Sequence, residues 1–257
     1  MRILAIGDVT STTAADYLAS VLWDYRKREK IDLVIANAEN AGFITGTSAE
    51  TARKLLLGGV DCLTGGNHTM RNRSVHTYLD EESAILRPIN FGGEVPGHGY
   101  TVLDVLGWRV LVISALGCVH MDPTLNSPFS YIDRVLLEEK GRYDFSVLDI
   151  HAEATGEKYA IGYEYDGRIN VVFGTHTHVQ TADEQILPLG TGYMTDIGMC
   201  GESEGILGIE RESVIASVKT HMPPKFKVAS GPVIALGAVF TLDTKSGRVT
   251  DIKRVKI

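Results

Sequence analysis

The sequence is poor in cysteine and has no cysteine pair at the spacing of a zinc or redox motif. Its three cysteines, Cys62, Cys118 and Cys200, lie far apart in the 257 residues. A small disulfide-stapled domain would instead show an even-numbered framework of closely spaced cysteines. We therefore expect free thiols in a reducing compartment. A chain of this length can bury a core without disulfides or a structural metal.

Long apolar runs are also missing. The longest, Val110–Val119, is about half of the ~20 residues that a membrane-spanning helix requires. The first residues, MRILAIGD, contain one basic residue and too short an apolar stretch for a secretory signal. Both absences predict a cytoplasmic protein without a membrane partner.

Positive charge is scarcer than negative charge. Lys and Arg number 25 against 32 Asp and Glu, which gives a formal net charge of −7. We therefore expect no nonspecific binding to DNA or to anionic membranes. A small anionic ligand remains compatible with this balance if a local positive group holds it.

Short apolar runs that alternate with helical patterns indicate an α/β protein. Without a Pro/Ser-rich linker or a repeat, the chain is expected to form one domain over residues 1–257. Strands are predicted over residues 3–6, 33–36, 61–64, 100–105, 108–116, 145–150, 169–173, 192–197, 233–242 and 249–255. Helices are predicted over 13–29, over 127–139, and from a capping box at Thr47–Glu50 to Gly58-Gly59. The alternation favours helices packed outside a sheet or sheets.

Polar side chains follow five of the predicted strands. They are Asp8, Glu39 with its neighbour Asn40, Asn67, His151, and the pair His176 and His178. Each alone has an ordinary structural interpretation, as a helix cap, a turn residue or a buried histidine. Functional groups of α/β proteins collect at the carboxyl ends of strands, so we expect these residues to converge.

The donor types in this set indicate a metal centre. Carboxylates, imidazoles and carboxamides without sulfur suit Mn, Fe or Zn rather than Ca or a structural zinc. A single catalytic ion commonly takes three or four protein ligands, fewer than the set offers. Two ions ~3.5–4 Å apart that share a carboxylate would use all of it.

The same residues carry a resemblance. The order Asp…GNH…H…GxHxH resembles the calcineurin-like metallophosphoesterase superfamily. More narrowly, the chain resembles the YmdB-like bacterial metallophosphoesterases in IGDV at 6–9, VIANAEN at 34–40, GGNH at 65–68, HAEAT at 151–155 and GTHTHVQTAD at 174–183. This resemblance spans almost the whole chain. It implies a four-layer α/β/β/α sandwich, a two-metal site and a phosphodiesterase that opens 2′,3′-cyclic nucleotides.

The resemblance also implies a role for each residue of the site. The first metal would be held by Asp8, Glu39, Asn40 and His178. Glu39 would bridge to the second metal, whose other ligands would be Asn67, His151 and His176. His68 would be the general acid that protonates the leaving oxygen, while a hydroxide bound by both ions attacks phosphorus. The expected ions are Fe or Mn, with Zn as the alternative.

Three segments depart from the family pattern. Many members of the superfamily have a histidine at the position of Thr10, but the YmdB-like group, like this chain, does not. Ser11–Ala14 replaces a Gly/Pro/basic segment, and Thr69-Met70 occupies a place where an aromatic residue is frequent. These departures bear on substrate preference rather than on the metal ligands.

Two other functions fit the same residues. A phosphomonoesterase or 5′-nucleotidase would use the same ions with more pocket cations, for which Arg71, Arg73 and Arg87 are candidates. A metal-bound regulatory or RNA-interacting module without turnover is the third interpretation. Glu153 and Asp183 are candidates for orienting ligand imidazoles, or else for surface solvation. The expected partner is a small phosphate ester such as a nucleotide, and the sequence is compatible with a homo-oligomer.

Overall fold

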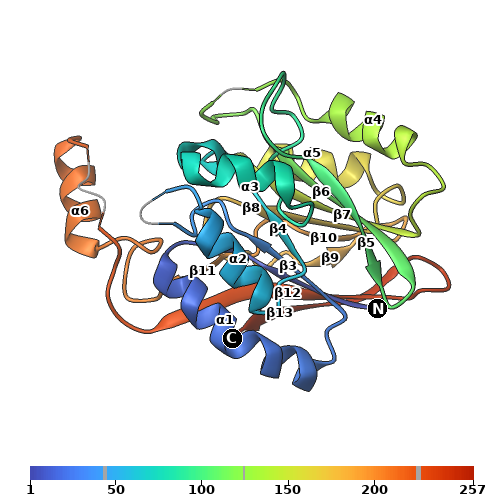
Figure 1. Ribbon diagram of the computed structural model, residues 1–257, viewed down its shortest axis with the longest axis horizontal. Helices are drawn as coiled ribbons and strands as arrows, with labels where there is room; N and C mark the ends of the chain where they lie inside the picture. The colour runs from blue at the N-terminus through green and yellow to red at the C-terminus, as the bar shows by residue number, and fades with distance from the viewer. Residues whose placement is uncertain (43–44, 124, 224–226) are drawn as a thin grey trace.

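The computed structural model describes residues 1–42, 45–123, 125–223 and 227–257, and its strands form two sheets (Figure 1). The first sheet consists of β1 (Arg2–Ile6), β2 (Asp8–Val9), β3 (Leu33–Asn37), β4 (Cys62–Thr64), β11 (Met199–Glu202), β12 (Val233–Leu242) and β13 (Val249–Lys256). Its order is β2-β11-β12-β1-β3-β4, and β13 pairs with β12. Because β1, β3 and β4 run parallel, their carboxyl ends lie at one edge of the sheet.

The second sheet consists of β5 (Tyr100–Val105), β6 (Trp108–Leu116), β7 (Phe145–His151), β8 (Val171–Thr175), β9 (Gln185–Ile186) and β10 (Gly192–Met194). Its order is β5-β6-β7-β8-β10-β9. The central strands β6, β7, β8 and β10 are parallel, whereas β5 and β9 pair antiparallel at the edges. The hairpin predicted around Gly107 is confirmed as β5 and β6.

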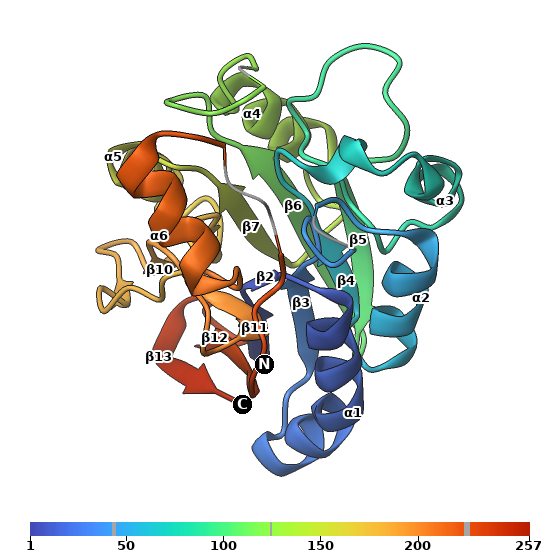
Figure 2. The ribbon, with the colours of Figure 1, turned by 90° about the vertical axis from the view of Figure 1, so that its left-hand side faces the viewer.

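Helices cover the outer faces of both sheets (Figure 2). The helices of the chain are α1 (Thr12–Glu29), α2 (Ala49–Leu57), α3 (His76–Glu81), α4 (Phe129–Glu138), α5 (Thr155–Glu164) and α6 (Arg211–Thr220), with 3-10 turns at Thr69–Arg71 and Arg73–Val75. α6 buries none of its residues and projects from the layers instead of covering a sheet (Figure 1). α1 and α2 pack on the first sheet, and α4 and α5 on the second. The predicted four-layer α/β/β/α sandwich is therefore confirmed. Among the described helices, none has the length and apolarity needed to cross a bilayer.

The alternation of side chains along β1 shows how the layers are held together. Leu4 packs with Leu18 of α1, on the helical side of the first sheet. Its neighbour Ile3 belongs to the cluster between the sheets, with Val112 and Phe173. Successive strand residues point to opposite faces, so one apolar run serves two cores. This double burial explains why the central strands read as continuous apolar segments.

Several predicted boundaries are wrong for identifiable reasons. The N-cap of α2 is Ser48 rather than Thr47, because the Ser48 hydroxyl accepts from the Thr51 amide. α4 starts after Pro128, since the residue before a proline is pushed out of the helical region. β8 starts at Val171, two residues after its predicted start, because the Ile169 amide donates to the Tyr165 carbonyl in the turn after α5. The elements that the sequence did not predict are β2, β9, β11, α3, α5 and α6.

Candidate metal centre

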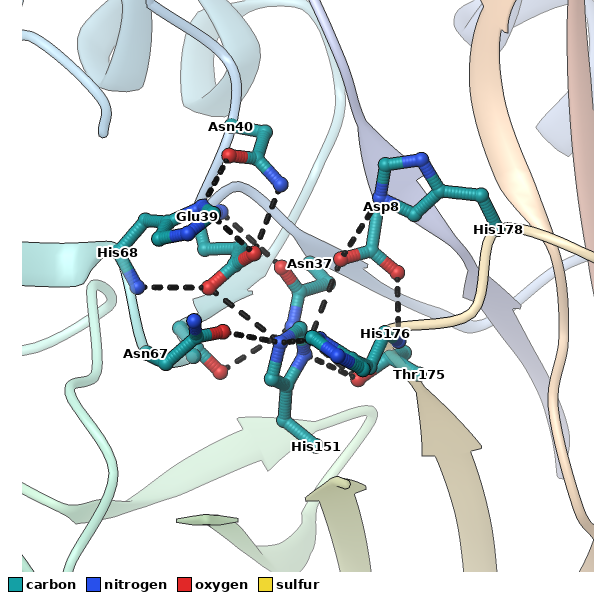
Figure 3. A network of polar contacts seen from close by, with 12 residues as sticks. Asp8, Asn37, Glu39, Asn40, Asn67, His68, His151, Thr175, His176 and His178 are labelled. Carbon is teal, nitrogen blue, oxygen red and sulfur yellow. Dashed lines mark hydrogen bonds and ion pairs between the residues drawn. The ribbon is translucent and has the colours of Figure 1, made fainter. Parts of the chain in front are cut away.

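The residues singled out in the sequence lie together where the carboxyl ends of strands from both sheets meet (Figure 3). Asp8 begins β2, Glu39 and Asn40 follow β3, Asn67 and His68 follow β4, His151 ends β7, and His176 and His178 follow β8. Both sheets therefore contribute to a single constellation. Such an edge is where α/β proteins gather their functional groups.

Donor atoms surround Nε2 of His151. Glu39 Oε2 lies 3.3 Å away, Asn67 Oδ1 3.1 Å and His176 Nδ1 3.0 Å. Asn67 is held in this orientation because its amide group donates to the Asp122 carbonyl at 3.1 Å. Ligand atoms of Glu39, His151 and His176 all lie within 4.8 Å of one another. This mixture of carboxylate, carboxamide and imidazole donors suits a divalent transition-metal ion.

The electrostatics of this cluster favour a positive charge at its centre. Burial opposes the imidazolium form of His151, but the charges of Glu39 and Asp8 outweigh burial and raise its pKa to about 9. Burial likewise opposes the Glu39 carboxylate, yet His151 keeps the pKa of Glu39 well below its usual range. For His176, burial and then the charge of His151 lower the pKa to about 3. His176 is therefore neutral, with one nitrogen free as a ligand.

Asp8 has a carboxylate oxygen without a hydrogen bond. Its Oδ2 accepts from the His176 backbone amide at 3.1 Å, whereas its buried Oδ1 has no hydrogen-bond partner among the described residues. His178 Nε2 lies 3.7 Å from that Oδ1. The Nδ1 of His178 donates to the Leu207 carbonyl at 3.2 Å, so its Nε2 faces Asp8. A buried carboxylate oxygen without a hydrogen bond from the described residues, with imidazole nitrogens of His151 and His178 each 3.7 Å away, is an arrangement that suits a bound cation.

Asn40 and His68 lie on the other side of Glu39. The Asn40 amide donates to Glu39 Oε1 at 2.7 Å, and its Oδ1 lies 2.8 Å from His68 Nδ1. The His68 backbone amide donates to Glu39 Oε2 at 2.9 Å. Burial lowers the pKa of His68. As a metal ligand, Asn40 would have to turn its amide, since its oxygen faces His68 in the structure.

Gly66 explains the double glycine that precedes Asn67. A Cβ on Gly66 would lie 2.2 Å from Glu39 Oε2 and 2.5 Å from His151 Nε2. Any side chain at this position would therefore displace two of the clustered donors. The glycine lets the backbone after β4 approach the centre closely.

A buried network behind His151 was missed by the sequence analysis. The hydroxyl of Thr175 donates to Asp149 Oδ1 at 2.8 Å and lies 2.9 Å from His151 Nδ1. Because that hydroxyl has one proton, His151 Nδ1–H must donate to it, which leaves Nε2 directed at the centre. Asn37 and Thr64 donate to the other oxygen of Asp149 at 3.1 and 2.5 Å. A signal was present, since Asp149 stands two residues before His151 and so faces the same side of β7.

The two acidic residues proposed to orient imidazoles behave differently. Glu153 Oε2 lies 3.0 Å from His176 Nε2, so this carboxylate accepts the Nε2 proton and leaves Nδ1 for a ligand. The contacts described for Asp183 are instead with Thr181, Thr195 and Tyr159. Asp149, rather than Asp183, is the second acid that orients an imidazole.

A cavity of about 320 Å³ opens beside Asn40, His68 and His178. Its wall is largely apolar, and its remaining lining residues are Thr10, Thr45, Arg71, Leu207, Gly208, Ile209, Lys227 and Val228. Of the predicted pocket cations, Arg71 lines this cavity, Arg87 lines a different one, and Arg73 is exposed. Lys227 also lines it, and its Nζ lies 2.5 Å from Glu210.

The segments that depart from the family pattern have structural roles. The Ser11 hydroxyl caps α1 by accepting from the Ala14 amide and donates to buried Glu202, both at 2.9 Å. The Thr69 hydroxyl bonds both the amide and the carbonyl of Gly66 at 2.8 Å. Thr10 lines the cavity, with its hydroxyl bonded to the Cys200 carbonyl at 3.2 Å.

Comparisons with known proteins show which family the chain resembles. A family model described as "YmdB-like protein" matches residues 4–255. The 2′,3′-cyclic-nucleotide 2′-phosphodiesterase of Bacillus subtilis (strain 168) is 38% identical over 257 residues, which cover 100% of this chain and 97% of the relative.

Solved structures resemble the chain as well. A novel phosphatase from Mycoplasma pneumoniae has a TM-score of 0.92 at 28% identity and covers 100% of this chain and 93% of its own. The NAD nucleotidase of Haemophilus influenzae has a TM-score of 0.60 at 14% identity, over 100% of this chain and 55% of its own. The second likeness concerns the fold alone.

Proposed function

This chain belongs to the YmdB-like family, and from that membership we propose that it is a metal-dependent phosphodiesterase. Its substrates would be small nucleotide phosphate esters, 2′,3′-cyclic nucleotides foremost. The family predicted from the sequence motifs is thereby confirmed. The substrate class rests on the similar Bacillus enzyme, whose name states that chemistry.

The observation that supports metal dependence best is the buried Oδ1 of Asp8, which has no hydrogen-bond partner among the described residues. With Glu39, Asn40 and His178 it would hold a first divalent ion. A second ion would be held by Glu39, Asn67, His151 and His176; donor atoms of the other three lie 3.0 to 3.3 Å from His151 Nε2. Glu39 would bridge both positions, because its two oxygens face Asn40 and His151 respectively. Fe or Mn fits these donors best, and Zn is the alternative.

Ions at these positions would acidify water and neutralise charge on the phosphoryl oxygens. The contribution of the chain is to hold the ligands in their coordinating forms. Thr175 and Glu153 fix the protons of His151 and His176 on the nitrogens that face away from the centre. The Leu207 carbonyl does the same for His178. All three imidazoles therefore direct the coordinating nitrogen at the centre without a change of ring orientation, and His151 would give up its Nε2 proton when an ion binds.

His68 is proposed as the general acid. Its imidazole lines the cavity and contacts Asn40 without lying among the clustered donors. As a general acid His68 would act in its imidazolium form, giving its Nε2 proton to the alkoxide leaving group and becoming a neutral imidazole.

The cavity fits a nucleotide with a nucleobase on its apolar wall. Leu207, Ile209 and Val228 supply that wall, and Arg71 supplies a cation for the phosphate. A phosphomonoesterase is the second candidate, since Arg71 would also favour a dianionic monoester. The Mycoplasma neighbour described as a phosphatase is consistent with this candidate.

Metal content and hydrolysis measured on one preparation would test the proposal. We expect about two ions per chain and faster hydrolysis of 2′,3′-cyclic AMP than of 3′,5′-cyclic AMP or 5′-AMP. Two ions with turnover of 5′-AMP alone would favour the phosphomonoesterase. Absence of hydrolysis after reconstitution with Fe and Mn would refute both enzymatic functions and favour the non-enzymatic module.

A further inference from the structure

The loop that carries His176 and His178 has an unusual backbone. Both histidines have positive φ, 106° for His176 and 62° for His178, a region that residues with a side chain seldom adopt. Such conformations persist only where surrounding contacts fix them. Figure 3 shows that this loop presents both imidazoles to the centre. The contacts that hold the loop therefore also determine where these imidazoles point.

Asp196 supplies the central contact to this loop. Its Oδ2 accepts from the backbone amide of Thr177, between the two histidines, at 3.0 Å. Its Oδ1 accepts from the Gly198 amide at 2.9 Å. The Gly198 carbonyl in turn accepts from the Asp8 amide at 3.2 Å. One carboxylate thus connects the histidine loop to the segment that supports Asp8.

Lys158 of α5 neutralises this carboxylate. Both side chains are fully buried, and Lys158 Nζ lies 2.8 Å from Asp196 Oδ2. An isolated buried charge would be costly, so each partner makes the other tolerable. The aliphatic part of Lys158 passes Gly174, where an added Cβ would lie 1.9 Å from the Thr195 carbonyl oxygen and 2.7 Å from Lys158 Cδ. The glycine that begins the GTHTH motif therefore makes room for the Thr195 backbone and for the lysine.

We propose that Lys158 and Asp196 form a positioning pair that holds His176 and His178 in their ligand geometry. Neither residue touches the centre, and both act through the Thr177 amide. A buried ion pair adds little to fold stability that well-packed apolar residues would not supply. Its value here is that a full negative charge fixes one amide of a strained loop. The consequence for metal binding rests on the proposed function.

Two variants of the full chain would test the pair. Asp196→Asn keeps the side-chain shape but removes the charge, and Lys158→Met keeps the aliphatic stem. The matched control is Asp166→Asn, because Asp166 is also buried and accepts from two backbone amides, those of Leu189 and Thr191. Asp166 lies at the opposite end of the sheet, before β8. The three readouts are Mn²⁺ affinity, thermal midpoint and hydrogen exchange at the Thr177 amide.

We expect both pair variants to bind Mn²⁺ about 10- to 100-fold more weakly, as is typical when an outer partner of a metal site is lost. Their Thr177 amide should exchange faster. Asp166→Asn should lower the thermal midpoint without changing the Mn²⁺ affinity or the exchange rate of the Thr177 amide. If single variants fail to fold, the double variant Lys158→Met/Asp196→Asn removes both charges together, and it should still bind Mn²⁺ weakly.

Unchanged Mn²⁺ affinity and unchanged Thr177 exchange in Asp196→Asn would overturn the positioning role. A parent chain that binds none of Mn²⁺, Fe²⁺ and Zn²⁺ would instead refute the proposed function. The exchange measurement needs no metal, so it tests the pair in either case.

Discussion

The Nε2 of His151 lies 3.0 Å from the Nδ1 of His176, and the two rings are inclined by 77°. Two nitrogen lone pairs at this distance would repel each other, so a proton or a metal ion must lie between them. Since the pKa of His151 is raised to about 9 and that of His176 is lowered to about 3, the proton belongs to His151 in the metal-free protein. A bound ion would therefore replace a proton.

Metal affinity should accordingly rise with pH. Below a pKa of about 9 His151 is an imidazolium, which cannot bind an ion, so each ion at this position must displace one proton. We expect about tenfold tighter binding per pH unit between roughly pH 6 and pH 8. Calorimetry in two buffers of different ionisation enthalpy would count the protons released. An affinity that does not change over this range would contradict the assignment.

Asp8→Asn should affect the metal-free and metal-loaded proteins in opposite ways. Burial raises the pKa of Asp8, and its Oδ1 has no hydrogen bond among the described residues. The ionised carboxylate therefore destabilises the folded protein when no cation is bound. The metal-free variant should therefore unfold at the same temperature as the parent or higher. The rise in thermal midpoint that saturating Mn²⁺ gives the parent, equivalent to about 2.7 kcal/mol at 100 times Kd, should shrink. A variant that keeps the full rise would exclude Asp8 as a ligand.

His68→Ala should abolish most turnover while keeping the metal. Loss of a general acid costs typically 10²–10⁴-fold in rate, and His68 is not one of the three residues, Glu39, His151 and His176, whose ligand atoms lie within 4.8 Å of one another. We expect kcat to decrease by a factor in that range. Elemental analysis should give the same metal content for the variant as for the parent. His76→Ala is the matched control, because His76 bonds the Met70 carbonyl and does not line the cavity. Near-normal kcat in His68→Ala would remove this residue from the mechanism.

The sequence predicted the convergence of the candidate site residues better than it predicted the bounds of the surrounding elements. A short apolar run precedes each of the candidate site residues, namely Asp8, Glu39, Asn67, His151 and the histidine pair. Buried parallel strands produce such runs whatever their contacts with distant parts of the chain. Their convergence then follows from the shared edge of parallel strands. The convergence could be predicted because each of these patterns lies within a short segment of the sequence.

Elements without a local signal were missed. α6 buries none of its residues, so it shows no apolar stripe. α5 begins at Thr155, and its N-cap residue Ala154 makes no side-chain capping hydrogen bond. Asp149 and Asp196 were missed because most of their side-chain partners are distant in sequence, as Asn37 is from Asp149 and Lys158 from Asp196. No pattern within a single segment reveals a contact of that kind.

Arg71 should govern the choice between monoester and cyclic diester. It lines the cavity beside His68, where its guanidinium can approach a bound phosphate. Hydrogen bonds to charged groups contribute about 1.5–3 kcal/mol, so Arg71→Gln should raise KM about tenfold or more. The increase should be larger for the dianion of 5′-AMP than for the monoanion of 2′,3′-cyclic AMP, because a second charge is left unneutralised.

Arg73→Gln is the matched control, since Arg73 is exposed two residues away and does not line the cavity. It should leave both KM values unchanged. An equal increase in KM in both variants would mean that the two arginines act only through the long-range electrostatic field of the protein surface. A KM that is unchanged in Arg71→Gln would mean that the guanidinium stays in solvent. The apolar wall and the metal centre would then have to bind the substrate without it.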